Sequence, residues 1–158
     1  MRGLVRVGAA VPSLALGNVK ENMKRHLAMM REAKEKHVSI VTFPELSLTG
    51  YTCGDLFFQR RLLDDVTDAL LTLKNEMPEG ILAVVGAPLE IEGALYNCAV
   101  VLHKGEIISA VPKTFLPNNG EFYEKRWFQS GDARRDASVA IPKLKTDVCR
   151  QAIFETED

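Results

Sequence analysis

The chain has 158 residues, and its 20 lysines and arginines nearly balance 21 aspartates and glutamates, giving a net charge of −1 at pH 7. This length suits one domain with a substantial core. The even charge balance argues against a protein that binds nucleic acid or a membrane surface. No apolar run reaches the roughly 18 residues that a membrane span requires.

The three cysteines, Cys53, Cys98 and Cys149, have no CxxC spacing, and the three histidines show no ligand spacing. An odd, unpatterned set of cysteines is typical of a reducing compartment and does not indicate a zinc site. We therefore expect a cytoplasmic globular protein without a metal centre.

The first half of the chain predicts alternating strands and helices. Residues 4–11 alternate apolar side chains on one face, which predicts a strand. Asn18, with Glu21 three residues later, resembles a capping box, and an amphipathic helix follows with apolar residues at Val19, Met23, Leu27, Met30 and Ala33. Residues 38–43 are nearly all apolar, as expected for a strand covered on both faces.

The second half continues with a helix over residues 62–77 and a buried strand at 81–88. Residues 95–102 and 106–111, joined at residues 103–105, predict a hairpin. This order predicts an α/β architecture with a mixed sheet. Short strand candidates follow at 139–141 and 152–154, and the chain then ends with no further element, so we expect the sheet to be incomplete.

Glu45 follows the strand at 38–43, within "VTFPELSLTGY" (41–51). A desolvated carboxylate is costly unless something compensates, and active sites of α/β sheets gather at the carboxyl ends of strands. Glu45 is therefore either a general acid or base or an exposed loop residue or helix cap. Lys113, in "AVPKTFLPN" (110–118), has the same placement and is either an oxyanion-stabilising group or a solvated loop lysine.

Two further segments could carry chemistry. "NNGEFYEKRWF" (118–128) interleaves aromatic and charged residues, which is compatible with an amide-binding pocket, an interface or a solvated helix with a buried aromatic stripe. Cys149 lies between Lys145 and Arg150, which could activate its thiol, but an inert cysteine is the more common case.

Taken together, "FPELSLTGY" (43–51), "PKTFLPN" (112–118) and "GEFYEKRWF" (120–128) resemble the nitrilase, or carbon–nitrogen hydrolase, superfamily. The longer runs "FPELSLTGYTCGDLF" (43–57), "LYNCAVVL" (95–102) and "PNNGEFYEKRWF" (117–128) resemble the N-terminal glutaminase domain of glutamine-dependent NAD synthetases. The resemblance extends in order from residue 5 to residue 131.

The resemblance implies an α-β-β-α sandwich of two sheets with helices outside. It implies that Glu45 is the general base for a cysteine nucleophile and that Lys113 steadies the tetrahedral oxyanion. It further implies that Glu121 orients the lysine, and that Tyr51 and Phe122 line a pocket for glutamine.

This sequence departs from the family in two places. Asn119 stands where an aromatic residue is common, and no stretch matches the "G-x-E-I-C-E-D" context of the nucleophile. We interpret Cys149 as a bystander, because Arg150 replaces the expected acid. Residues 1–158 are therefore expected to be a partial glutaminase domain. The synthetase domain, with its ATP and nicotinate dinucleotide, is expected to be absent because no "SGGxxS" stretch occurs, so this chain itself would hold no cofactor.

Three functions remain open from the sequence. The first is hydrolysis of glutamine to supply ammonia for NAD synthesis, by a fragment that lacks the nucleophile. The second is a non-catalytic interaction module, and the third is a stand-alone nitrilase-type amidase. An incomplete sheet exposes an edge and apolar faces, so we also expect a homo-oligomer.

Overall fold

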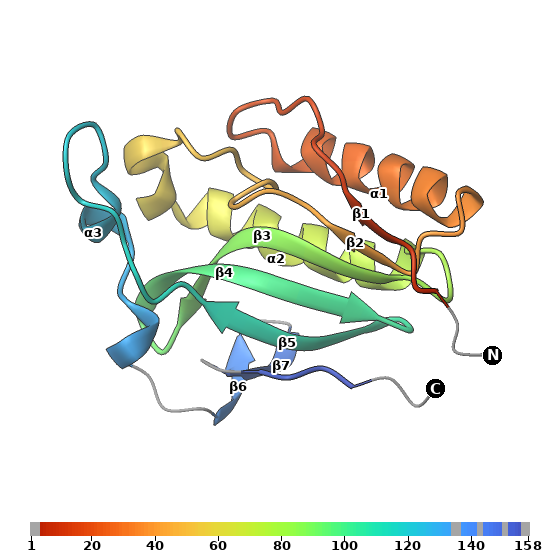
Figure 1. The fold of residues 1–158 in the computed structure, drawn as a ribbon. Coiled ribbons are helices and arrows are strands. Elements are labelled where there is room, and N and C mark those ends of the chain that lie inside the picture. Colours follow the sequence, from red (N-terminus) through yellow and green to blue (C-terminus); the bar gives the residue numbers. More distant parts are fainter. Residues whose placement is uncertain (1–3, 134–136, 142–143, 150–151, 156–158) are drawn as a thin grey trace.

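In the computed structural model, which describes residues 4–133, 137–141, 144–149 and 152–155, two long helices lie against a mixed sheet (Figure 1). The described strands form one seven-stranded sheet in the order β1-β2-β3-β4-β5-β7-β6. The strands are β1 (Val7–Ala9), β2 (Ile40–Thr42), β3 (Leu82–Ile91), β4 (Ala94–His103), β5 (Glu106–Pro112), β6 (Ala137–Ile141) and β7 (Leu144–Val148). The helices are α1 (Val19–Glu35), α2 (Arg60–Glu76) and the single turn α3 (Glu124–Trp127), with 3-10 turns η1 (Gly54–Phe58) and η2 (Gly131–Ala133).

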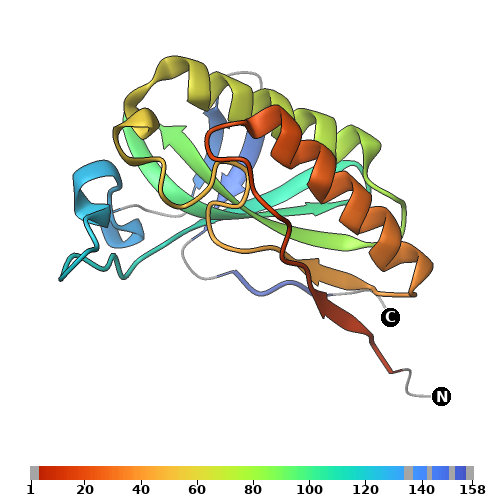
Figure 2. The same cartoon turned by 90° about the horizontal axis from the view of Figure 1, so that it is seen from above.

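Helices α1 and α2 lie side by side on one face of the sheet, as the view from above shows (Figure 2). Helix α1 begins where the sequence predicts, because the side chain of Asn18 accepts a hydrogen bond of 3.2 Å from the backbone N–H of Glu21. Both helices are amphipathic, and the apolar residues they bury include Val19, Leu27 and Met30 of α1 and Leu62, Val66, Leu70 and Leu73 of α2. Burial of these stripes, rather than helix propensity, supplies most of the stability of the two helices.

Strands β3, β4 and β5 form an antiparallel meander joined by two tight turns. In each turn both central residues have positive φ: 52° and 79° at Glu92 and Gly93, and 49° and 74° at Lys104 and Gly105. This backbone matches the right-handed twist of the flanking strands. The hairpin at residues 103–105 confirms the prediction. The hairpin at Glu92–Gly93 was missed, and it makes β3 and β4 longer than predicted.

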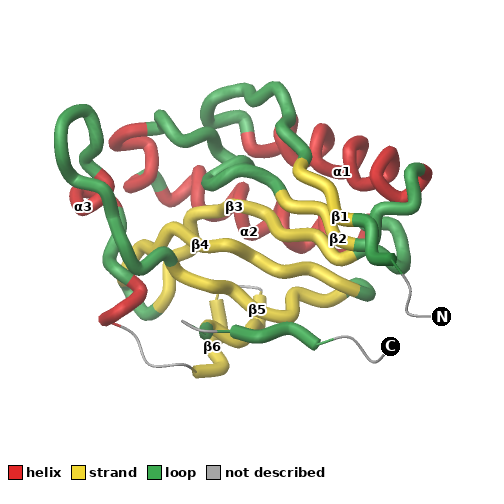
Figure 3. The backbone as a smooth tube through the Cα atoms, in the orientation of Figure 1, coloured by secondary structure: helices red, strands yellow, loops and turns green. Residues whose placement is uncertain are grey.

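The segment after β2 lies at the carboxyl end of the parallel strands. Strands β1, β2 and β3 pair in parallel, with Thr42 beside Val84, so β2 delivers the chain to the carboxyl end of this part of the sheet. The loop after β2, η1 and α3 lie together at that end of the molecule (Figure 3). This is the position that α/β folds use for active sites.

The mixed α/β fold is confirmed, whereas two details differ from the prediction. Residues 152–154 were expected to form a strand but are loop, and the last described strand is β7, which pairs in parallel with β5 at Ser109 and Ala110. Strand β1 spans three residues instead of eight, because only these residues pair with β2. Of the expected sandwich, the described residues contain one sheet and one helix layer.

Candidate active site

Glu45 sits in a tight elbow, residues 43–50, that follows β2. Leu46 has a positive φ of 51°, and the backbone N–H groups of Thr49 and Gly50 both donate to the carbonyl of Leu46. The elbow lies against β3 at Gly86, where a Cβ atom would come within 2.3 Å of the Pro44 carbonyl oxygen. Only glycine permits this approach. The close contact between Gly86 and the backbone of residues 44–46 therefore fixes the position of Glu45 relative to β3.

Buried polar side chains of helix α1 form hydrogen bonds to the elbow and hold it in place. The His26 Nδ1–H donates to the Asn22 carbonyl at 2.7 Å, which leaves Nε2 to accept from the Ser47 hydroxyl at 2.9 Å. The amide of Asn22 also donates to the Leu48 carbonyl at 3.1 Å. Burial lowers the pKa of His26, which keeps the ring neutral, and only the neutral ring can accept from Ser47.

The ammonium group of Lys113 bridges two carboxylates. Its Nζ lies 2.7 Å from Glu45 Oε1 and 2.9 Å from Glu124 Oε1. Lys113 directly follows β5, and its backbone N–H donates to the Asn97 carbonyl at 2.8 Å. The Asn97 side-chain amide donates to Glu45 Oε1 as well. Residues from β4, the elbow, the end of β5 and α3 thus meet around one cation.

Glu124 is the most deeply buried member of this cluster, with 1% of its side chain exposed. The hydroxyl of Tyr51 donates to its Oε1 at 2.6 Å. Its other oxygen, Oε2, is buried and has no hydrogen-bond partner among the described residues. A buried carboxylate oxygen without a donor is costly, so Glu124 is held in this position at a cost in stability.

The carboxylates set the protonation states of their neighbours. Burial alone would lower the pKa of Lys113, but hydrogen bonds and charges from Glu45 and Glu124 outweigh burial and raise it above its ordinary value. Lys113 is therefore fully charged at neutral pH. Burial, and then the hydrogen bond to Glu124, raises the pKa of Tyr51, which remains a neutral donor.

The structure brings together three of the five predicted site residues. Glu45 and Lys113 are in direct contact, and Tyr51 joins them through Glu124. Phe122 is about two-fifths exposed and lies edge-on to the Tyr51 ring, with 6.4 Å between centroids. Glu121 is exposed, and no ion pair joins it to Lys113 among the described residues; Glu124, three residues later, forms an ion pair with Lys113.

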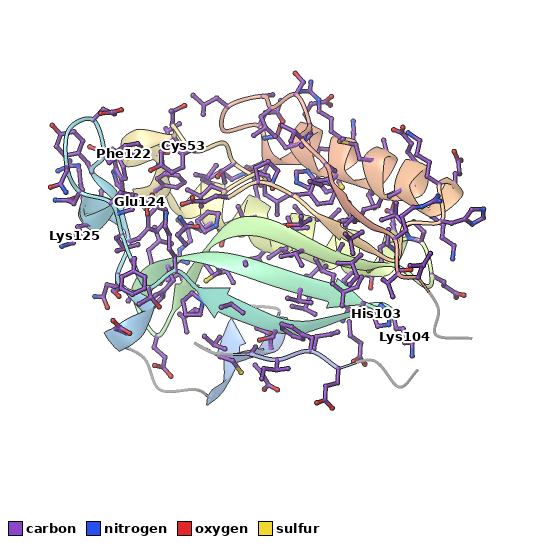
Figure 4. The ribbon with its side chains drawn as sticks, viewed as in Figure 1. Cys53, His103, Lys104, Phe122, Glu124 and Lys125 are labelled. Carbon is purple, nitrogen blue, oxygen red and sulfur yellow. The ribbon has the colours of Figure 1, made fainter. Side chains whose placement is uncertain are left out.

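A helical pattern could have identified Glu124. Glu124 and Phe128 are four residues apart, so they share one face of a helical turn, and both are buried, at 1% and 3% exposure. Glu121 precedes the turn. Glu124 lies on the side of α3 facing the sheet, while Lys125 points outward (Figure 4).

No hydrogen bond joins Cys53 or Cys149 to Glu45 or Lys113 in the described part of the chain. Cys53 and Cys98 are buried, and burial raises the pKa of the Cys53 thiol, which donates to the Thr49 carbonyl. Cys149 is half-buried, and its backbone N–H donates to the Ala110 carbonyl beside β5. The described residues also contain no cluster of three or more metal-ligating side chains and no helix able to span a membrane.

The sequence model of the carbon-nitrogen hydrolase family matches residues 6–156. The chain belongs to this family. A solved glutamine-dependent NAD(+) synthetase from Cytophaga hutchinsonii superimposes with a TM-score of 0.84 at 28% identity, over 91% of this chain and 25% of that one. An amidase from Nesterenkonia sp. superimposes with a TM-score of 0.69 at 19% identity, over 86% of this chain and 51% of that one, which shows the fold alone.

Among sequence relatives, the glutamine-dependent NAD(+) synthetase of Mycobacterium tuberculosis (strain ATCC 25618 / H37Rv) is 41% identical over 134 residues, covering 84% of this chain and 20% of the relative. The enzyme of the same name from Aquifex aeolicus is 33% identical over 138 residues, covering 87% of this chain and 24% of the relative. The chain therefore spans about a fifth to a quarter of the length of these synthetases.

Proposed function

We propose that this chain carries the base and the oxyanion-stabilising group of a glutaminase that supplies ammonia for NAD synthesis. The observation that supports this best is the Lys113 ammonium held between Glu45 and Glu124. An ammonium group has three donors, and the two carboxylates take two of them. The third is left for an oxygen that gains negative charge.

The hydrogen-bond donor and acceptor that this cluster leaves free complement a primary carboxamide. Glu45 Oε2 has no hydrogen-bond partner among the described residues, and the Glu45 side chain is 40% exposed, whereas Glu124 Oε2 is enclosed by the protein. The free Glu45 oxygen and the third Lys113 donor match one N–H donor and the carbonyl oxygen of the side-chain amide of glutamine. Tyr51 and Phe122, whose rings form a T-shaped pair, would line the pocket around the rest of the substrate.

In the reaction, Glu45 would take the proton of a cysteine thiol as its sulfur attacks the amide carbon, while Lys113 stabilises the oxyanion. The C–N bond then breaks, and Glu45 passes the proton to the departing ammonia. Water, deprotonated by Glu45, hydrolyses the thioester to glutamate and restores the thiol. We propose that the nucleophile comes from outside residues 1–158, as do the groups that would bind ATP and a nicotinate dinucleotide.

Binding of L-glutamine to the chain, followed by NMR, tests the proposal. We expect saturable binding that Lys113→Met weakens at least about tenfold, the scale of one hydrogen bond to a charged group. Lys125→Met is the matched control, since Lys125 is an exposed lysine of α3 that points away from Glu124 (Figure 4), and it should bind like the wild type.

Two results would contradict the proposal. Absence of saturable glutamine binding would favour a non-catalytic module, and tighter binding of butyramide than of glutamine would favour a stand-alone amidase. An intact-mass spectrum after exposure to an electrophilic glutamine analogue completes the test. No adduct is expected, and an adduct on Cys149 would place the nucleophile within this chain.

A further inference from the structure

Three hydrogen bonds from α3 converge on one exposed carboxylate, that of Asp55. Arg126 donates from Nε to Oδ1 at 2.8 Å and from Nη2 to Oδ2 at 2.7 Å. The indole Nε1–H of Trp127 donates to Oδ1 at 3.0 Å. Asp55 belongs to η1, and more than 70 residues of chain separate it from its two donors. This cluster, the Asp55 clamp, joins two of the three sequence runs that carry the narrower resemblance, 43–57 and 117–128.

The Asp55 clamp acts on the element that carries Glu124. Helix α3 spans only Glu124–Trp127, and a single turn does not persist by itself, because helix nucleation is unfavourable. Its placement therefore depends on contacts with other elements. Beneath the Asp55 clamp, the buried ring of Phe57 packs on Trp127 and Phe128, with centroid separations of 5.9 Å and 5.0 Å.

Charge attraction alone does not explain the Asp55 clamp. Asp55 and Arg126 are 61% and 58% exposed, and exposed ion pairs contribute little to stability. The geometry is more informative: a two-pronged arginine–carboxylate pair fixes both distance and orientation. The added indole donor orients two successive residues of α3 at once. The expected effect is on where Glu124 lies more than on whether the chain folds.

We propose that Asp55 is a positioning residue: through Arg126 and Trp127 it sets the orientation of α3, so that Glu124 is held against Lys113 and Tyr51. Its importance for glutamine hydrolysis rests on the function proposed above, but the placement of Glu124 does not. Asp55 touches none of the groups around Lys113 directly, so it acts only through α3.

The test is the rate at which an amine-specific reagent labels Lys113, measured by mass spectrometry on the whole chain. Only the neutral amine reacts, and the two carboxylates keep Lys113 charged. In Asp55→Asn, withdrawal of Glu124 should lower the pKa of Lys113 and speed labelling by about threefold, equivalent to about half a pKa unit. Glu124→Gln, which removes the charge outright, is the positive control.

Asp65→Asn is the matched negative control. Arg61 Nε donates to both oxygens of Asp65, at 2.9 and 3.0 Å, on the exposed face of α2, so this variant breaks a comparable surface ion pair that has no link to α3 among the described residues. Its Lys113 should be labelled at the wild-type rate. Asp55→Glu, which keeps a carboxylate for Arg126, should be labelled more slowly than Asp55→Asn.

Trp127 is the single tryptophan of the chain, so its fluorescence reports directly on the Asp55 clamp and should change in Asp55→Asn but not in Asp65→Asn. The proposal is overturned if Lys113 of Asp55→Asn is labelled at the wild-type rate, or if Lys125 and other exposed lysines accelerate equally. If Asp55→Asn does not fold, Arg126→Lys provides the same comparison, because lysine keeps the positive charge but cannot form the two parallel hydrogen bonds to Asp55. Because no readout requires glutamine, failure here is separable from failure of the proposed function.

Discussion

Replacing Gly86 by alanine should displace the elbow that carries Glu45. The new Cβ would lie 2.3 Å from the Pro44 carbonyl oxygen, 2.4 Å from the Leu46 nitrogen and 2.8 Å from the Glu45 carbonyl carbon. All three are backbone atoms, so no side-chain rotation relieves the clash. The elbow must withdraw by roughly 1 Å to restore ordinary packing distances.

That withdrawal has two costs. Overpacking of this kind typically destabilises a protein by about 1–3 kcal/mol. The hydrogen bond of 3.1 Å from the Leu48 N–H to the Gly86 carbonyl is also strained, which adds about 1 kcal/mol. We therefore expect Gly86→Ala to lower the free energy of unfolding by about 2–4 kcal/mol.

Urea denaturation followed by Trp127 fluorescence measures this loss. Gly8→Ala is the matched control, because Gly8 also lies in a strand of the sheet and its added Cβ would meet only the two Val38 methyl groups, at 3.4 and 3.7 Å. That substitution should change stability by less than about 1 kcal/mol. If Gly86→Ala were as stable as Gly8→Ala, the elbow would not be pinned against β3 as the structure indicates.

Three more outcomes follow from the same contacts. Phe57→Ala should lower the free energy of unfolding by about 3–5 kcal/mol, because the buried ring supports α3; a loss no larger than that of exposed Phe58→Ala would refute this. Stability should also decline as pH falls below the ordinary histidine pKa of 6.5, because burial lowers the pKa of His26 and the unfolded chain then binds the extra proton. The slope is at most about 1.4 kcal/mol per pH unit for one proton, and His26→Gln should flatten it in urea titrations at several pH values. Tyr51→Phe, which takes a donor from buried Glu124, should cost about 1–3 kcal/mol by urea denaturation; wild-type stability would show that water replaces the hydroxyl.

Periodicity was sufficient for most of the fold. The stripes of α1 and α2 and the apolar runs of β2 to β5 depend on local spacing, and the structure has elements at these places. The hairpin at Glu92–Gly93 was missed because glutamate seldom occupies a position with positive φ. Strand β7 and the loop at 152–154 lie where the sequence is polar and the periodic signal weak.

The candidate site was predictable only in part, for a different reason. Glu45 and Lys113 stand out because each lies within three residues of the end of a strand, which is a local signal. That they meet depends on the order of strands in the sheet, which no local pattern gives. Glu124 was not predicted, because its burial depends on where a single helical turn begins, and element boundaries are the least certain part of a sequence-based prediction.

The burial of Glu124 ties the geometry of the site to the stability of the fold. A carboxylate with 1% exposure requires compensation, and the described residues provide it from two directions, Lys113 after β5 and Tyr51 after the elbow. Both donors bind the same oxygen of Glu124, Oε1, and leave Oε2 without a partner. One donor on each oxygen would satisfy the buried carboxylate more fully. Glu45 shows the same pattern, because Lys113 and the side-chain amide of Asn97 both donate to its Oε1. The chain thus concentrates its own hydrogen bonds on one oxygen of each carboxylate and leaves the other without a donor. For Glu124, whose Oε2 is buried, the missing donor lowers the stability of the folded chain, whereas the Glu45 side chain is 40% exposed to solvent.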